Sequence, residues 1–122
     1  MRTLAIQLLR NPGRRFELAQ TSEVKRLRLT PEAELDLDDA YSWYRAQAPG
    51  LAANFLAVVG TCLGSIRRHP EAYQLVDATM RRALLRRFPY AVFYEVGAVQ
   101  IVVYAVFHCA RNPRAWMRRR DG

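Results

Sequence analysis

The pattern of hydrophobic and polar positions is clearest near the C-terminal end, where two apolar runs at residues 92–96 and 99–106 flank Gly97-Ala98. Both runs are rich in β-branched and aromatic residues, which suit a pleated surface, so they predict two strands. A two-residue loop with glycine first is typical of a type II′ turn, whose twist matches that of the strands. The expected register pairs Val96 with Val99, Tyr94 with Ile101, Val92 with Val103 and Tyr90 with Ala105.

Neither face of this hairpin is plainly polar, because the second face carries Phe93 beside Val102 and Ala91 beside Tyr104. A sheet with one solvated side alternates more cleanly than this one does. We therefore expect both faces to be covered, one by helices of the same chain and the other by a terminal segment or by a partner.

Residues 81–88 predict a third strand, in which apolar residues are set among arginines before Pro89. Four arginines within seven residues predict an acidic neighbour; they are Arg81, Arg82, Arg86 and Arg87. The alternative is a solvated strand edge that is kept charged to deter aggregation.

A first helix is predicted from Thr30-Pro31-Glu32 to about Gln47. Threonine caps the unpaired amides, proline at the first helical position has no N–H to satisfy, and an acid follows at the positive end of the helix dipole. Apolar residues then recur at intervals of three and four, which predicts a buried stripe. The stripe consists of Ala33, Leu37, Ala40, Tyr41, Tyr44 and Ala48.

A second helix is predicted from Leu51 to Arg68, after a turn at Pro49-Gly50. Its stripe has the spacing of an amphipathic helix that packs on a core. It contains Leu51, Phe55, Val58, Val59, Cys62 and Ile66.

The order of elements predicts an α+β fold, with a helical hairpin on one face of a largely antiparallel sheet. Residues 24–29 form a short strand that could pair at the sheet edge, and 71–79 form a loop anchored by Tyr73 and Leu75. After the last strand, Trp116 packs back on the sheet ahead of a basic tail at 118–120. A single domain of residues 23–122 is expected.

Residues 1–22 read as an N-terminal appendage, because Asn11-Pro12-Gly13 breaks any helix begun earlier. An extra helix, a disordered basic arm and residues translated from an upstream start codon remain open alternatives. We expect no secretory signal, since no small-residue cleavage site follows the short apolar run. No apolar run reaches the ~18 residues of a membrane span, so no membrane partner is expected.

The net charge of +8 and the isoelectric point near 10.3 predict attraction to nucleic acid or to an acidic protein. Residues 31–48 are the exception, with a net charge of −4, which leaves +12 on the remainder. Their acids are spaced too densely around one helix to converge on a metal, so a solvated face is predicted. These acids are Glu32, Glu34, Asp36, Asp38 and Asp39.

The only cysteines are Cys62 and Cys109, without CxxC or Cys/His spacing. Such sparse cysteine use fits a reducing cytoplasm and predicts neither a structural metal nor a cofactor.

Four strings in this order resemble the ParE/RelE superfamily of bacterial toxins from type II toxin–antitoxin modules, and within it the ParE-like plasmid stabilisation branch. They are RLRLTPEAELDLDDAYSWY at 26–44, IRRHPEAY at 66–73, RRALLRRFPYAVFYEV at 81–96 and IVVYAVFHCARNPRAW at 101–116. The resemblance implies a small toxin in a hetero-oligomer with a cognate antitoxin, an acidic protein whose flexible segment folds on binding. It further implies DNA gyrase as target for the ParE branch, or the ribosome and its A-site mRNA for the RelE branch.

Our first hypothesis is a toxin that binds gyrase and has no active site of its own. The second is a ribosome-dependent, metal-independent mRNA endonuclease, and the third is an inactive relic that retains antitoxin binding only. The expected target- or antitoxin-binding residues are Arg81, Arg82, Arg86, Arg87, Trp43, Arg111 and Arg114.

A metal-free nuclease needs groups that transfer protons and cations that stabilise the charge on phosphate. Histidine is the side chain that most readily exchanges a proton at neutral pH, so His108 suits the first role, as could Tyr94 or Tyr104. Its structural alternative is a bond to a backbone carbonyl at a strand end. RelE-type nucleases typically carry a C-terminal tyrosine, and none follows Tyr104. The candidate catalytic residues are His108, Arg81, Arg87 and Arg111.

Overall fold

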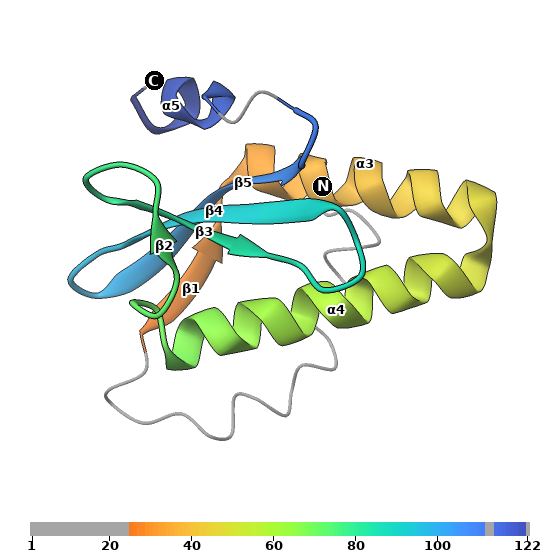
Figure 1. Cartoon of the computed structure of the whole chain (residues 1–122), viewed down its shortest axis with the longest axis horizontal. Coiled ribbons are helices and arrows are strands. Elements are labelled where there is room, and N and C mark those ends of the chain that lie inside the picture. The colour runs from red at the N-terminus through yellow and green to blue at the C-terminus, as the bar shows by residue number, and fades with distance from the viewer. Residues whose placement is uncertain (1–24, 112–113, 122) are drawn as a thin grey trace.

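A computed structural model describes residues 25–111 and 114–121 (Figure 1). The N-terminal appendage predicted at residues 1–22 lies outside the described residues. The elements in chain order are β1 (Arg26–Leu29), α3 (Pro31–Gln47), α4 (Pro49–Arg68), β2 (Gln74–Leu75), β3 (Met80–Leu84), β4 (Tyr90–Val96), β5 (Gln100–His108) and α5 (Ala115–Asp121).

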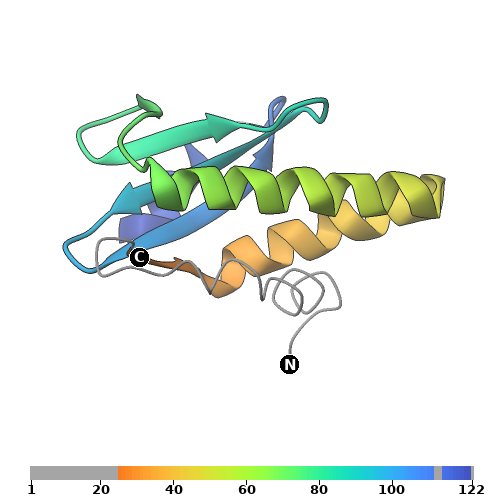
Figure 2. The same cartoon turned by 90° about the horizontal axis from the view of Figure 1, so that it is seen from below.

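The fold is α+β, as the sequence predicts, with α3 and α4 paired along one face of a five-stranded sheet (Figure 2). The strand order is β1-β5-β4-β3-β2, in which β1 runs parallel to β5 and all other neighbours are antiparallel. The predicted three-stranded meander is therefore confirmed as β3-β4-β5, and the first strand lies at an edge. The loop predicted at 71–79 differs, because it contains the two-residue strand β2.

Helix α3 begins where its capping residues predict. The Thr30 side chain accepts a hydrogen bond from the backbone N–H of Ala33 at 3.2 Å, and Pro31 occupies the first helical position. The prediction that Ala48 belongs to the buried stripe is wrong, because Ala48 is an exposed, extended residue that joins the two helices. The residues of the stripe that are buried are Ala33, Leu37, Ala40 and Tyr44.

Helix α4 begins at Pro49, so the predicted Pro49-Gly50 turn is in fact its first turn. Its stripe is shifted by one residue at this end, where Ala52 is buried and Leu51 is exposed. By length and composition α4 could cross a membrane. Phe55 and Val59 are nevertheless completely buried in the cluster that α3, α4 and the sheet share, as in a core helix.

The hairpin register differs from the prediction. Val96 pairs with Ile101, and the turn residues are Ala98 and Val99, flanked by a hydrogen bond from the Gly97 N–H to the Gln100 carbonyl at 2.8 Å. Val99 is 79% exposed, so the turn removes it from the sheet.

A β-bulge at Tyr104 also changes which face of the sheet the later residues of β5 lie on. Tyr94 pairs with Val103 but Phe93 pairs with Ala105, which leaves Tyr104 without an opposite residue. Beyond the bulge, Ala105 belongs to the cluster on the face away from α3 and α4, whereas the prediction placed it on the same face as Val92 and Tyr94, which lie in the cluster beneath the helices.

Strand β3 ends at Leu84 and not at residue 88. Leu85 and Phe88 both turn into the core, so the chain has to reverse between them. Arg87 takes a left-handed conformation in this turn, with φ of 71°. Arg86 and Arg87 therefore lie beyond the strand that was predicted to carry them. The loop anchors also differ, since Tyr73 packs on the core but Leu75 is 47% exposed.

The second face of the sheet is covered by the C-terminal segment, one of the two coverings expected. The predicted basic tail forms the short helix α5 (Figure 1). Its Trp116 is 4% exposed and stacks on Phe93 at 6.2 Å between ring centroids. The cluster on this face comprises Met80, Ala91, Phe93, Ala105, Phe107 and Trp116.

Candidate binding surface

Most of the candidate residues gather at one end of the sheet, where the β3–β4 turn meets the end of β5. Tyr90 pairs with His108, and the Cys109 N–H donates to the Pro89 carbonyl at 2.8 Å. Arg86 and Arg87 precede this junction and Arg111 follows it. The structure therefore brings three of the predicted arginines to the same end of the sheet as His108.

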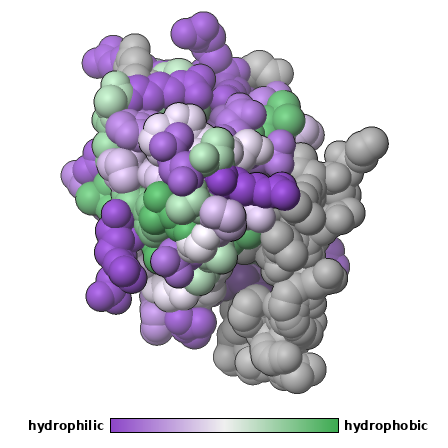
Figure 3. All heavy atoms as spheres, turned by 90° about the vertical axis from the view of Figure 1, so that its right-hand side faces the viewer, coloured by the Kyte–Doolittle hydropathy of each residue, from purple (hydrophilic) through white to green (hydrophobic). Residues whose placement is uncertain are grey.

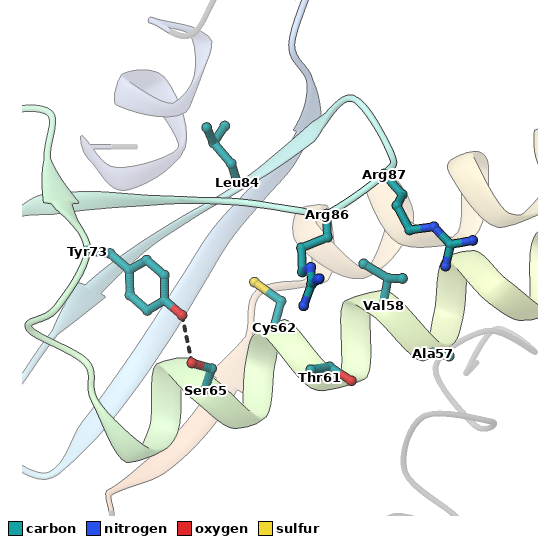
Figure 4. A pocket seen from close by; sticks show the side chains of 9 residues that line it. All are labelled: Ala57, Val58, Thr61, Cys62, Ser65, Tyr73, Leu84, Arg86 and Arg87. Atoms are coloured by element: carbon teal, nitrogen blue, oxygen red, sulfur yellow. Dashed lines mark hydrogen bonds between the residues drawn. The ribbon is translucent and has the colours of Figure 1, made fainter.

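Two hollows flank this end, and we name them after the helix that borders each. The α3 hollow has a volume of about 610 Å³ and contains three candidate residues, Trp43, His108 and Arg111. The α4 hollow has a volume of about 490 Å³ and contains two, Arg86 and Arg87 (Figure 4).

In the α3 hollow, His108 is exposed and its Nδ1 accepts the Ala110 N–H at 3.0 Å. The sequence suggested a backbone carbonyl as partner, and the observed partner is a backbone N–H. Since Nδ1 accepts this bond, the proton of the neutral ring is on Nε2. The ring meets Tyr90 edge-on at 5.2 Å between centroids.

Arg111 and Trp43 form the cationic and aromatic parts of the same hollow. The Arg111 guanidinium lies 4.0 Å from the centroid of the Phe107 ring, which orients it without neutralising it. Trp43 is 58% exposed and meets Tyr44 edge-on at 5.1 Å. Around this end of the molecule, hydrophobic and hydrophilic surface is interleaved (Figure 3).

Asp36 borders this hollow in a role that the sequence did not predict. It was assigned to the solvated acidic face, but its side chain is only 9% exposed and forms a bidentate pair with Arg119 at 2.7 and 3.1 Å. It also accepts the Val106 N–H at 2.9 Å. The Asp36 side chain therefore links α3, β5 and α5, and no local sequence signal predicts this role.

The floor of the α4 hollow is neutral. Ser65 and Tyr73 share a hydrogen bond of 2.7 Å. Burial raises the pKa of the Cys62 thiol to about 11, so it is protonated at neutral pH. Arg86 and Arg87 at the rim are exposed and form no hydrogen bond or ion pair with any other described residue. A neutral floor with a cationic rim suits an anionic ligand.

The remaining candidate arginines lie elsewhere. Arg81 donates to the carbonyls of Tyr73 at 2.7 Å and Glu71 at 3.2 Å, and Arg82 donates to the Gln74 side chain at 2.9 Å. Both therefore tie the β2 segment to β3. Arg114 is exposed just before α5.

The two candidate tyrosines are protonated at neutral pH. Burial raises the pKa of Tyr94, whose hydroxyl donates to the Pro70 carbonyl at 2.6 Å. Burial, followed by the neighbouring Glu95, raises the pKa of Tyr104. Neither side chain suits a general base. In the part of the chain that the structure describes, no three His, Cys, Asp or Glu side chains gather as a metal site would require.

A family model described as "ParE toxin of type II toxin-antitoxin system, parDE" matches residues 27–113. Among solved structures, one described as "Chromosomal ParDE TA system from P. aeruginosa" is similar to this chain, with a TM-score of 0.63 and 19% identity. The match covers 71% of this chain and 98% of that one, and at this identity it concerns the fold alone. No curated protein matches.

Proposed function

Since this chain belongs to the ParE toxin family of type II toxin–antitoxin systems, we propose that it arrests growth by binding DNA gyrase and that a cognate antitoxin neutralises it. The observation that carries this proposal is the family match across residues 27–113, which includes both long helices and nearly the whole sheet. Gyrase acts on DNA in the cytoplasm, and we propose the same location for the toxin.

The distribution of the candidate nuclease residues supports a binding inhibitor. Arg81 is engaged by loop carbonyls, Arg87 borders the α4 hollow, and His108 and Arg111 border the α3 hollow. A nuclease needs its proton donor, acceptor and cations around one scissile phosphate. These four side chains are divided among three places.

The charge distribution supports an acidic antitoxin that orders on binding and forms a hetero-oligomer with the toxin. The chain carries +8, and Arg86 and Arg87 present guanidinium groups to solvent beside a neutral hollow. Carboxylates of a partner would gain charge-assisted hydrogen bonds there.

A supercoiling assay with purified gyrase tests this proposal. We expect the toxin to inhibit supercoiling and the Trp43→Ala variant to inhibit less, because Trp43 is an exposed aromatic side chain that can anchor a partner. Leu35→Ala is the matched control, since Leu35 lies on the same helix with 57% exposure but outside both hollows. Unimpaired supercoiling by a preparation that still arrests growth would reject gyrase as the target.

One observation favours a second candidate, a ribosome-dependent mRNA endonuclease. Trp43, His108 and Arg111 share the α3 hollow, where they could stack on a base, transfer a proton and contact a phosphate. Mapping mRNA 5′ ends after incubation with translating ribosomes tests it. Cuts within A-site codons that disappear in His108→Ala would establish this activity, and intact mRNA would reject it. A protein that does neither but binds antitoxin would be the inactive relic.

A further inference from the structure

The α3 hollow contains two exposed side chains of opposite charge, Asp39 on α3 and Arg111 after β5. Within the part of the chain that the structure describes, neither side chain forms a hydrogen bond or an ion pair, and the Arg111 guanidinium contacts only the Phe107 ring. The other acid of the hollow, Asp36, is already paired with Arg119 at 2.7 Å. The hollow therefore suits a ligand that has hydrogen-bond donors at one end and an anion at the other.

Aromatic side chains line the same hollow. Trp43 follows Asp39 by four residues, so the two are neighbours on one face of α3, and its indole is 58% exposed. The half-buried Tyr90 borders the hollow at the start of β4. An exposed aromatic ring beside a carboxylate suits a flat heterocycle that stacks on the ring and presents donors at its edge. Unpaired nucleic-acid bases are bound in this way.

The carboxylate of Asp39 selects among the bases. An ionised carboxylate can only accept hydrogen bonds. Guanine offers it two adjacent donors, the ring N1–H and the 2-amino group. Adenine and cytosine offer one amino group next to a ring nitrogen that is itself an acceptor, and uracil offers one N–H between two carbonyls. Guanine is therefore the base that Asp39 fits best.

The side of the hollow formed by β5 and the residues after it suits the phosphate of the same nucleotide. The Arg111 guanidinium lies 4.0 Å from the centroid of the Phe107 ring, and guanidinium groups bind phosphate through paired N–H donors. The neutral His108 ring carries its proton on Nε2 and is a second donor. The hollow volume of about 610 Å³ lies within the range of roughly 300–1,000 Å³ that is typical of small-molecule sites.

We propose that the α3 hollow is a binding site for a guanine nucleotide, with the base on Trp43, its donor edge on Asp39 and its phosphate on Arg111. The site goes beyond the proposed function, because it requires neither gyrase nor an antitoxin. It also breaks no bond, which separates it from the endonuclease alternative. The nucleotide is either free or part of a single strand, since both present the same groups.

The charges of the hollow argue against other ligands. An arginine side chain of a partner would offer donors to Asp39 but would be repelled by Arg111. An acidic peptide would be attracted by Arg111 and repelled by Asp39. In a nucleic-acid duplex, the donor edge of guanine is already paired with cytosine and cannot reach a carboxylate.

The first test exchanges the base specificity of the full-length protein. Asp39→Asn replaces one carboxylate oxygen with an amino group, which clashes with the 2-amino group of guanine but can donate to the carbonyl that xanthine has there. By calorimetric titration, we expect Asp39→Asn to bind guanosine 5′-monophosphate at least tenfold more weakly than wild type and to gain affinity for xanthosine 5′-monophosphate. A misfolded variant could not gain affinity for the second ligand.

Asp38→Asn is the matched control, because Asp38 precedes Asp39 on the same helix but lies outside both hollows. It should retain the wild-type preference for guanine. Equal wild-type affinity for the guanine and adenine nucleotides would overturn the proposal. Asp39→Asn binding both purine nucleotides as wild type does would overturn it as well.

The second test concerns the phosphate. Wild type should bind guanosine 5′-monophosphate about tenfold more tightly than guanosine, and Arg111→Gln should lose this preference while it still binds guanosine. Arg45→Gln, an exposed arginine of α3 outside both hollows, is the control and should keep the preference. A preference that persists in Arg111→Gln would overturn the assignment of the phosphate to Arg111.

Short RNAs distinguish the two sources of the nucleotide. Tighter binding of the trinucleotide UGU than of guanosine 5′-monophosphate would identify guanine within a single strand as the ligand, and the reverse order would identify the free nucleotide. Both results support the site. Binding of UUU as tight as that of UGU, or no binding of any guanine ligand, would overturn it.

Discussion

The two edges of the sheet differ in how their backbone groups are covered. At each edge, a short strand pairs with only part of its neighbour. On one side, β1 pairs with β5 only as far as Val103, and the rest of the β5 edge is closed by side chains: Asp36 accepts the Val106 N–H and Arg119 donates to the Tyr104 carbonyl at 3.1 Å. On the other side, β2 covers β3 only as far as Arg82, and Leu84 remains exposed. The exposed part of the β5 edge is therefore covered by side chains, whereas the β3 edge is open beyond Arg82.

The largest expected effect comes from breaking the closed edge. Asp36→Ala removes the carboxylate that pairs with Arg119 and the acceptor of the Val106 N–H. Because a largely buried cation and a backbone donor lose their partner together, we expect a loss of about 4 kcal/mol in the free energy of unfolding. Urea denaturation measures it. Glu32→Ala, an exposed acid in the first turn of the same helix, is the control: it loses only its interaction with the helix dipole and should change stability by less than about 1 kcal/mol.

A proline scan along β3 sharpens the comparison at the open edge. Ala83→Pro places the ring where the N–H donates to β4, in a completely buried position, and should destabilise the fold by about 3 kcal/mol. Leu84→Pro removes only the outward N–H and should change stability by less than about 1 kcal/mol. Thermal unfolding of both variants measures the contrast. Similar losses at the two positions would mean that the Leu84 N–H is already used within the fold.

Salt should affect the two edges unequally. Raising the ionic strength from about 0.05 M to about 0.5 M shortens the screening length well below 10 Å, so the antitoxin should bind severalfold more weakly near Arg86 and Arg87. The Asp36–Arg119 pair is largely buried and should be affected less. Titrations with the antitoxin and unfolding curves at both salt concentrations test this. Salt-independent binding of the antitoxin would argue against the role of the arginines.

The smallest expected effect concerns Asp77, which lies in the loop between β2 and β3. The backbone N–H groups of Met80 and Thr79, followed by Arg120, lower the pKa of Asp77. A lowered folded-state pKa stabilises the protein above the unfolded-state pKa, and this contribution is lost as pH falls through the folded-state value. Asp77→Asn should therefore reduce the decline in stability below the usual aspartate range. Denaturation midpoints across acidic pH compare the two proteins, and parallel profiles would contradict the expectation.

Local patterns in the sequence determine the elements and the fold class. Thr30-Pro31 places the start of α3, and the apolar spacing of both helices predicts most of their buried residues. The β-branched runs predict β4 and β5, and the family resemblance follows from the same strings. Such signals can be predicted because each depends on residues a few positions apart.

The candidate surface was predicted less completely. Trp43, His108 and Arg111 were named from residue type alone, and only the fold places them in one hollow. Arg81 and Arg87 come from one short stretch, yet Arg81 ties down a loop while Arg87 lies in a turn whose position depends on Leu85 and Phe88 packing inward.

Local sequence patterns predicted both long helices and four of the strands, with approximate ends, but not the short strand β2 or the helix α5. Tertiary packing sets three further features: the bulge at Tyr104, the Asp36–Arg119 pair across 83 positions, and the open edge at Leu84. The physical reason is that strand register and edge coverage depend on the relative lengths of neighbouring strands and on which distant side chains reach them. No periodicity within one segment records either quantity.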